Sequence, residues 1–275
     1  MTEDHTFRAM RHACLVEPGT QADLAHRSTS DRLGTDKGGA QAGLAGLTER
    51  LSLLHQRLYA ERKRALLVVL QGLDASGKDG TIRRVFTGLN PQGCDVTSFK
   101  APAPNELAHD YLWRIHQCLP ARGDIGIFNR SHYEDVVAAQ VIGAIDDRRR
   151  KRRYDEIVAF EQMLREEGTW IVKIFLHVGK DEQRARLQAR LDNPEKRWKF
   201  ERADLDTRAK WDEYMRLYEA AISATSTKTA PWYVVPADHK WVSGLAAASI
   251  LLHTLEDLDP KIPPPADDLD GIVIA

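Results

Sequence analysis

The segment that most restricts the fold of this 275-residue chain is LQGLDASGKDG, residues 70–80. It contains Gly72, four further residues, and then Gly77 and Lys78. The apolar run ALLVVL (65–70) precedes it and predicts a strand buried on both faces, while residues 78–89 predict a helix. A strand, a glycine-rich loop and a helix in this order allow backbone N–H groups and the positive end of the helix to hold a phosphate. The segment therefore predicts a phosphate-binding loop in an α/β fold.

The rest of the chain alternates short apolar runs with amphipathic stretches. Further strands are predicted at 94–99, 124–128, 170–178 and 232–235. Helices are predicted at 40–63 and near 105–118, 131–143, 152–167, 181–191, 205–224 and 240–256. The stripe Trp211, Tyr214, Met215, Tyr218 and Ile222 has helical spacing and predicts a buried core face. Alternating strands and helices predict a parallel sheet with helices on both faces.

We divide the chain into three parts. We expect residues 1–38 to form an irregular N-terminal arm and residues 39–258 to form a single phosphate-loop kinase domain. Residues 259–275 are expected to form a proline-rich acidic tail. The three cysteines are odd in number and widely spaced, as in a reduced, cytoplasmic protein. The chain begins with no secretory pattern and has no apolar run long enough for a membrane span. With a net charge of −1 and basic residues interleaved with acids, it gives no indication of nucleic-acid binding.

The loop carries two carboxylates that a phosphate site does not ordinarily tolerate. Asp79 occupies the position of the Ser or Thr that usually holds magnesium, and Asp74 lies within the loop. A carboxylate among phosphates is repelled unless a cation lies between them, so Asp74 is the predicted Mg²⁺ ligand. Asp79 is interpreted as a first-turn helix residue favoured by the helix dipole. The predicted phosphate-binding positions of the loop are Gly72, Ala75, Ser76, Gly77, Lys78, Asp79 and Gly80.

Two further segments carry candidate site residues. The strand at 124–128 leads into Asn129 and Arg130, at the sheet edge where α/β proteins bind ligands, with Glu134 shortly after. His132 is interpreted as structural, because a phosphate-oxygen nucleophile needs no general base. In the basic segment 181–205, Arg186 and Arg190 share one helix face. This segment is either a solvated charged helix or a lid that supplies cations to a phosphoryl group.

These residues lie in stretches that resemble the type 2 polyphosphate kinases, and specifically the class III subclass that phosphorylates both AMP and ADP. The similarity runs from about Leu44 to Trp241. The matching stretches are residues 58–102, which include the loop, 106–114, RGDIGIFNRSHYEDV (122–136), DEQRARLQARLDNPEKRWKF (181–200) and 226–241. The resemblance implies a P-loop kinase fold with a helical basic lid. It also implies Mg²⁺-dependent transfer of the terminal phosphate of inorganic polyphosphate to AMP and ADP, giving ADP and ATP.

The resemblance also implies roles for individual residues. Asp74 matches the loop carboxylate tied to metal and catalysis, Lys78 the loop lysine, and Arg130 the arginine after the strand. Asn129 and Glu134 match the pattern of the subclass that accepts mono- and diphosphates, and Glu134 is a second candidate metal ligand. Arg186, Arg190 and Lys199 match basic lid positions that bind phosphate. The resemblance further implies a homo-oligomer, a dimer or tetramer.

Three points stay open at this level. An ATP-dependent nucleoside monophosphate kinase would share the fold and differ in the donor. GMP and GDP are alternative acceptors to AMP and ADP. Phe99 and Trp113 are each either core residues or the aromatic side chain that stacks on the acceptor base.

Overall fold

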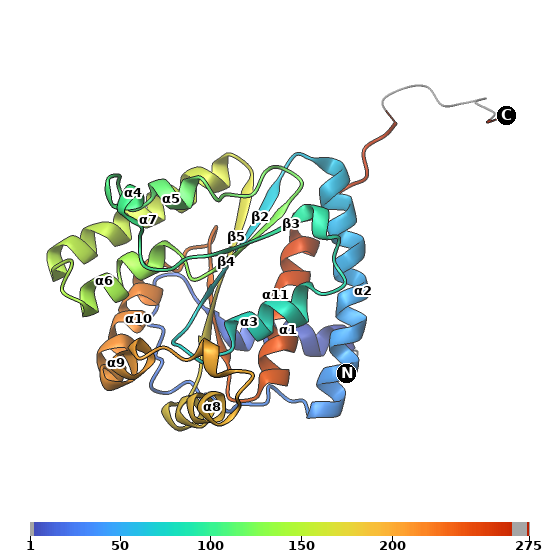
Figure 1. The fold of residues 1–275 in the computed structure, drawn as a ribbon. Helices are drawn as coiled ribbons and strands as arrows, with labels where there is room; N and C mark the ends of the chain where they lie inside the picture. The colour runs from blue at the N-terminus through green and yellow to red at the C-terminus, as the bar shows by residue number, and fades with distance from the viewer. Residues whose placement is uncertain (1–2, 266–273, 275) are drawn as a thin grey trace.

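A six-stranded sheet forms the centre of the computed structural model, which describes residues 3–265 and 274. The strands lie in the order β1-β6-β5-β2-β4-β3 (Figure 1). Their bounds are Leu15–Val16 (β1), Ala65–Gln71 (β2), Cys94–Ser98 (β3), Ile125–Asn129 (β4), Thr169–His177 (β5) and Trp232–Pro236 (β6). Neighbouring strands are parallel except β1, which pairs antiparallel with β6.

Helices cover both faces of this sheet (Figure 1). One face carries α1 (Glu3–Cys14), α2 (Lys37–Glu61), α3 (Lys78–Phe86) and α11 (Lys240–Leu258). The other carries α4 (Pro104–Leu107), α5 (Trp113–His116), α6 (Ala138–Val141), α7 (Asp147–Glu166) and α10 (Trp211–Thr225). Helices α8 (Lys180–Asp192) and α9 (Ala203–Ala209) lie beyond the carboxyl ends of the strands. The predicted α/β fold, with helices on both faces of a mainly parallel sheet, is confirmed.

Strand β2 occupies the middle of the sheet, between β5 and β4. All seven of its residues are buried, because helices cover both of its faces. This is why its sequence is continuously apolar rather than alternating. The loop that leaves β2 therefore begins at a rigid, central point of the molecule.

The N-terminal segment contains a helix and a strand, whereas the sequence predicted an irregular arm. Residues 3–14 form helix α1, and Leu15–Val16 add an edge strand to the sheet. Phe7, Met10 and Cys14 are spaced by three and four residues, and all three are buried, with α1 packed against α11. The prediction was wrong for residues 3–16, because this apolar stripe lies in an otherwise polar segment.

Three predicted helices are shorter or divided. Residues 105–118 form α4 and α5, separated by a turn in which Asp110 Oδ1 accepts from the Leu112 N–H at 3.0 Å. Residues 131–143 form a short 3-10 helix, His132–Asp135, followed by α6. Residues 205–224 lie in α9 and α10, which are separate helices.

The chain beyond α11 contains no helix or strand over residues 260–265. The rest of the predicted acidic tail, except Ile274, lies outside the described residues. Within the part of the chain that the structure describes, no helix is both long and apolar enough to cross a membrane.

Candidate active site

The phosphate loop, residues 72–77, follows β2 directly and ends at the start of α3. Gly72 has a φ of 147°, and a Cβ there would lie 2.7 Å from Ser76 Oγ and 2.9 Å from the Leu176 carbonyl oxygen. Only glycine fits this position. Ala75 and Gly77 also have positive φ angles, 61° and 109°. Successive N–H groups in a turn that includes such left-handed residues form a concave surface that binds anions.

Lys78, the first residue of α3, folds back onto this loop. Its Nζ donates to the carbonyl oxygens of Gly72 at 2.6 Å and Leu73 at 3.2 Å, and the side chain is buried. Burial, and after it the charge of Arg130, lower the pKa of Lys78 to about 8. Asp74 and Glu134 partly offset this shift. The ammonium group is thus fixed beside the loop and titrates close to neutral pH.

Arg130 joins the end of β4 to the phosphate loop. The register of the sheet places Asn129 beside Leu70, and the Arg130 N–H donates to the Leu70 carbonyl oxygen at 2.9 Å. The guanidinium contacts the Asp74 carboxylate and lies 4.0 Å from Glu134 Oε2. Burial disfavours the charged guanidinium, but Glu134 and Asp74 together raise the pKa of Arg130. One arginine therefore lies between two carboxylates at the carboxyl edge of the sheet.

Glu134 is enclosed by polar groups from two other elements. Tyr218 on α10 places its hydroxyl 3.5 Å from Glu134 Oε1. With its amide turned to match its neighbours, Gln71 donates to the same oxygen at 2.9 Å and accepts from Ser131. Burial raises the pKa of Glu134, and Asp74 adds to that shift, while Arg130 and Lys78 oppose it.

Asp79 was expected to interact with the helix dipole, and it also contacts two other side chains. Its carboxylate accepts from Asn129 Nδ2 at 2.9 Å and lies 3.6 Å from Lys199 Nζ. Burial raises the pKa of Asp79, but Asn129 and Lys199 outweigh it and lower the pKa below its usual value. The contact brings the 3-10 helix Arg197–Lys199, in the predicted lid segment, onto the first turn of α3.

The three predicted lid cations lie in different environments. Lys199 reaches Asp79, and Arg190 lies 3.8 Å from Asp204 on α9. Arg186 is almost fully buried and contacts the backbone of the phosphate loop. Whether each binds phosphate stays a prediction.

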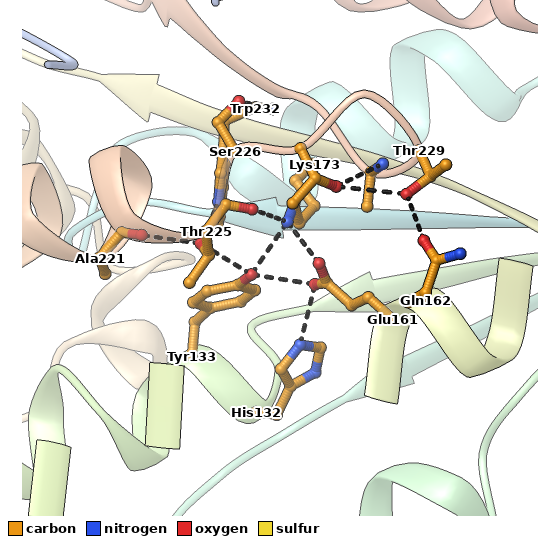
Figure 2. A network of polar contacts seen from close by, with 12 residues as sticks. His132, Tyr133, Glu161, Gln162, Lys173, Ala221, Thr225, Ser226, Thr229 and Trp232 are labelled. Carbon is orange, nitrogen blue, oxygen red and sulfur yellow. Dashed lines mark hydrogen bonds and ion pairs between the residues drawn. The ribbon is translucent and has the colours of Figure 1, made fainter. Parts of the chain in front are cut away.

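His132 lies in a buried polar network next to the site, which Figure 2 shows. Its Nε2 is 3.3 Å from Glu161 Oε1, and Glu161 Oε2 is 2.5 Å from Lys173 Nζ. The Tyr133 hydroxyl donates to Glu161 at 2.9 Å, and Lys173 also donates to the Thr225 carbonyl oxygen at 2.7 Å. Burial would raise the pKa of Glu161, but Lys173 and His132 lower it. The interpretation of His132 as structural agrees with this burial.

The two predicted metal ligands, Asp74 and Glu134, both lie beside Arg130. In the part of the chain that the structure covers, no group of three or more His, Cys, Asp or Glu residues could hold a metal ion. Magnesium commonly binds one or two carboxylates together with substrate phosphates. Asp74 and Glu134 supply two such carboxylates on either side of Arg130, and the Ser76 hydroxyl in the loop is buried with no partner among the described residues. The residues therefore fit a magnesium ion that is bound together with phosphate.

Four residues that lie at the site were not identified from the sequence: Gln71, Gln183, Asp204 and Tyr218. Asp204 lies 3.8 Å from Arg190, and burial and the charge of Asp74 in the loop raise the pKa of its carboxylate. Tyr218 belongs to the stripe predicted as core. Its ring is buried as predicted, while its hydroxyl faces Glu134. Helical spacing alone shows which face is buried and gives no indication of where a hydroxyl at its edge points.

The two aromatic candidates for base stacking also differ. Phe99 is buried in the core, with its ring edge-on to Phe128 at 4.9 Å between centroids. Trp113 is partly exposed and stacks on His109 at 4.0 Å. Phe99 is thus a core residue, whereas one face of the Trp113 ring is covered by the imidazole of His109.

Comparison with known proteins places this geometry in a family. The family model described as "Polyphosphate kinase 2" matches residues 34–263. The AMP/ADP-polyphosphate phosphotransferase of Meiothermus ruber is 51% identical over 262 residues, which cover 94% of this chain and 98% of that protein. The ADP-polyphosphate phosphotransferase of Rhodopseudomonas palustris is 48% identical over 227 residues, 78% of each chain.

A solved structure gives the same result. The crystal structure of polyphosphate kinase 2 from Arthrobacter aurescens TC1 superposes with a TM-score of 0.91 at 42% identity, covering 95% of this chain and 94% of that one. The sequence and the fold both match members of this family along nearly the whole chain. This chain belongs to the polyphosphate kinase 2 family.

Proposed function

We propose that this protein transfers the terminal phosphate of inorganic polyphosphate to AMP and ADP, giving ADP and ATP. The observation that carries the proposal is the grouping of Lys78 and Arg130 with the carboxylates of Asp74 and Glu134 at the phosphate loop. Two cations and two acids at one loop suit a reaction between two polyanions. The names of the relatives support polyphosphate as the donor and AMP and ADP as acceptors.

The reaction is an in-line displacement at phosphorus. A terminal phosphate oxygen of AMP or ADP attacks the terminal phosphorus of the chain, and the bond from that phosphorus to the bridging oxygen breaks. The leaving group is polyphosphate shortened by one unit. The nucleophile is already ionised, so the protein needs to supply position and positive charge rather than a base.

Each cation has a place in this reaction. Lys78 and the loop N–H groups hold the transferring end of the donor, and Arg130 neutralises charge on the reacting phosphoryl oxygens. Arg190 and Lys199 hold the chain from the lid side. Asn129 orients Asp79, to which it donates a hydrogen bond, and keeps it engaged with Lys199. We assign Asp74, and secondarily Glu134, to hold Mg²⁺, which would supply further neutralisation of phosphate charge.

The protein is expected to act in the cytoplasm and as a homo-oligomer, and GMP and GDP are expected to be alternative acceptors. These three expectations rest on the sequence and its resemblance to the family. Sedimentation analysis tests the assembly, and assays with guanine nucleotides test the acceptor.

The experiment that tests the function is product analysis with purified protein, MgCl₂ and AMP. One reaction receives long-chain polyphosphate and a parallel reaction receives ATP as the donor. We expect ADP and then ATP with polyphosphate, and no phosphate transfer to AMP when ATP is the only donor. ADP formed from AMP only when ATP is supplied would identify an ATP-dependent nucleoside monophosphate kinase instead.

A further inference from the structure

Helix α8 binds the phosphate loop on its carbonyl side. Gln183 Nε2 donates to the Asp74 carbonyl oxygen at 3.1 Å. Arg186 Nη1 donates to the carbonyl oxygens of Ala75 at 3.0 Å and Ser76 at 2.9 Å. Two side chains of α8 therefore hold three consecutive carbonyl groups of the loop.

Arg186 makes these contacts as part of a fully used set of donors. A guanidinium has five N–H donors. Nη2 donates to the carbonyl oxygens of Ala237 at 2.6 Å and Asp238 at 2.9 Å, and Nε donates to Glu182 at 2.7 Å. The two bonds from Nη1 complete the five, and the side chain is only 8% exposed. A phosphate could reach Arg186 only by displacing one of these bonds.

Gln183 is held at both ends of its amide group. Its residue is fully buried, and its Oε1 accepts from Arg208 Nη1 at 2.9 Å. Arg208 lies on α9 and also donates to the Lys180 carbonyl oxygen at 2.6 Å. The amide of Gln183 thus has its oxygen toward α9 and its nitrogen toward the phosphate loop.

These bonds bear directly on the anion-binding surface of the loop. In one peptide unit the C=O and the N–H point in opposite directions. Holding the carbonyls of Asp74 and Ser76 toward α8 therefore turns the N–H groups of Ala75 and Gly77 away from α8. Ala75 has a φ of 61°, which a non-glycine residue keeps only where its surroundings hold it there.

We propose that Arg186 and Gln183 are positioning residues that hold the peptide groups of the phosphate loop in their anion-binding orientation, and that Arg186 is not a phosphate ligand. The proposal rests on the proposed function, since polyphosphate is the anion that the loop receives. It replaces the role that the resemblance implied for Arg186. It also makes α8, the first helix of the lid, part of the support of the loop.

The test compares Arg186→Lys, Arg186→Met and Gln183→Leu with the wild-type protein. Arg184→Met is the matched control, because Arg184 is on the same helix with a side chain 70% exposed. Two quantities are measured for each: kcat and KM for polyphosphate, and Kd for polyphosphate without acceptor over a range of salt concentrations. Thermal unfolding shows which variants are folded.

The salt series separates positioning from direct binding. For nucleic acids, each lost contact between a cation and a phosphate lowers the slope of log K against log[salt] by roughly 0.7–0.9. We expect Arg186→Lys and Arg186→Met to raise Kd at least tenfold with the wild-type slope. The ammonium of lysine cannot hold four carbonyl groups, and methionine has no donor to hold any of them. We expect Gln183→Leu, which removes no charge, to raise Kd three- to tenfold with the same slope.

Two results would overturn the proposal. The first is a slope reduced by about one contact in Arg186→Met together with near wild-type affinity in Arg186→Lys, which identifies a phosphate ligand. The second is wild-type Kd and KM in Gln183→Leu and in whichever Arg186 variant folds. If the wild-type protein itself neither binds polyphosphate nor uses it, the proposed function fails, and that result is seen before any variant is made.

Discussion

Asp74 and Asp79 are two carboxylates of one short segment with different partners. Asp74 contacts Arg130, next to Glu134, whereas Asp79 is held by Asn129 and Lys199. The first arrangement places a carboxylate oxygen where a cation shared with phosphate can bind. The second connects the lid to the first turn of α3. The two acids should therefore respond differently to the same substitution.

Asp74→Asn keeps the size of the side chain and removes its charge. We expect a loss of about 100-fold or more in kcat, since the proposed mechanism uses this charge to hold the metal near the transferring phosphate. Asp79→Asn is the matched control, with an expected loss of less than tenfold that appears mainly in KM for polyphosphate. Steady-state rates at several MgCl₂ concentrations give both numbers. Unchanged turnover of Asp74→Asn at saturating magnesium would remove Asp74 from the metal site.

Lys78 predicts a pH dependence. Its pKa of about 8 means that the ammonium is charged below this pH and neutral above it. A bound polyanion favours the charged form and raises the pKa in the complex. We therefore expect kcat/KM for polyphosphate to fall as the pH rises through about 8, while kcat falls only at higher pH. Profiles of both constants between pH 6.5 and 9.5 check this, and parallel profiles with no decline in kcat/KM would contradict it.

At this scale the sequence predicts what is local. Lys78 and Asp74 follow from the spacing of the loop after its strand, because a strand, a loop and a helix assemble from adjacent residues. Gln183 could not be predicted, since its partner Asp74 is 109 positions away and nothing in a buried glutamine indicates a carbonyl. The contact between Asn129 and Asp79 follows from the order of the strands, which the sequence does not show.

At the scale of elements, the pair Glu161–Lys173 ties α7 to β5, and Tyr133 and Thr225 extend it to the segment after β4 and to the end of α10 (Figure 2). Lys173 is fully buried and Glu161 is 2% exposed. A buried charge without its partner is unfavourable by several kcal/mol, whereas two apolar residues in place of both charges are often tolerated.

We expect Glu161→Gln to lower the free energy of unfolding by about 3–5 kcal/mol, because it leaves the Lys173 ammonium buried without a carboxylate. The double variant Glu161→Leu/Lys173→Met should lose less than the sum of its single variants. Urea unfolding measures all of these. Glu166→Gln on the exposed side of α7 is the control, with an expected change within about 0.5 kcal/mol. A loss of less than 1 kcal/mol for Glu161→Gln would show that the pair is replaceable by a neutral hydrogen bond.

The order of the elements was predicted better than their ends. Strands β2 to β6 were each predicted because apolar runs of that length between turns have few other interpretations. Strand β1 has two residues, which is too short for any periodicity. The turn between α4 and α5 is held by the Asp110 side chain and carbonyl group, and helical spacing continues across it.

At the scale of the whole molecule, the N-terminal segment connects the sheet edge to the support of the active site. Ser226 Oγ donates to the Val16 carbonyl oxygen at 2.7 Å, and Ser249 Oγ donates to that of Phe7 at 2.8 Å. Further along, Thr29 Oγ1 donates to Asp238 Oδ2 at 2.6 Å, and the Asp238 N–H donates to the Thr29 carbonyl oxygen at 3.0 Å. Asp238 in turn provides one of the carbonyl groups that hold Arg186.

The family model begins at residue 34, yet this structure buries Phe7, Met10, Val16 and Leu24 before that point. A chain that starts at Leu33 would expose the faces of α11 and β6 that these side chains cover. If this exposure lowers the free energy of unfolding by about 5 kcal/mol, the midpoint of thermal unfolding falls by roughly 10 °C or more. We expect this decrease, with lower affinity for polyphosphate even at temperatures where the shortened chain is folded. Calorimetry and polyphosphate binding measure the two effects, and Thr29→Val tests the second alone. A shortened chain with wild-type stability and affinity would show that the N-terminal segment does not support the domain.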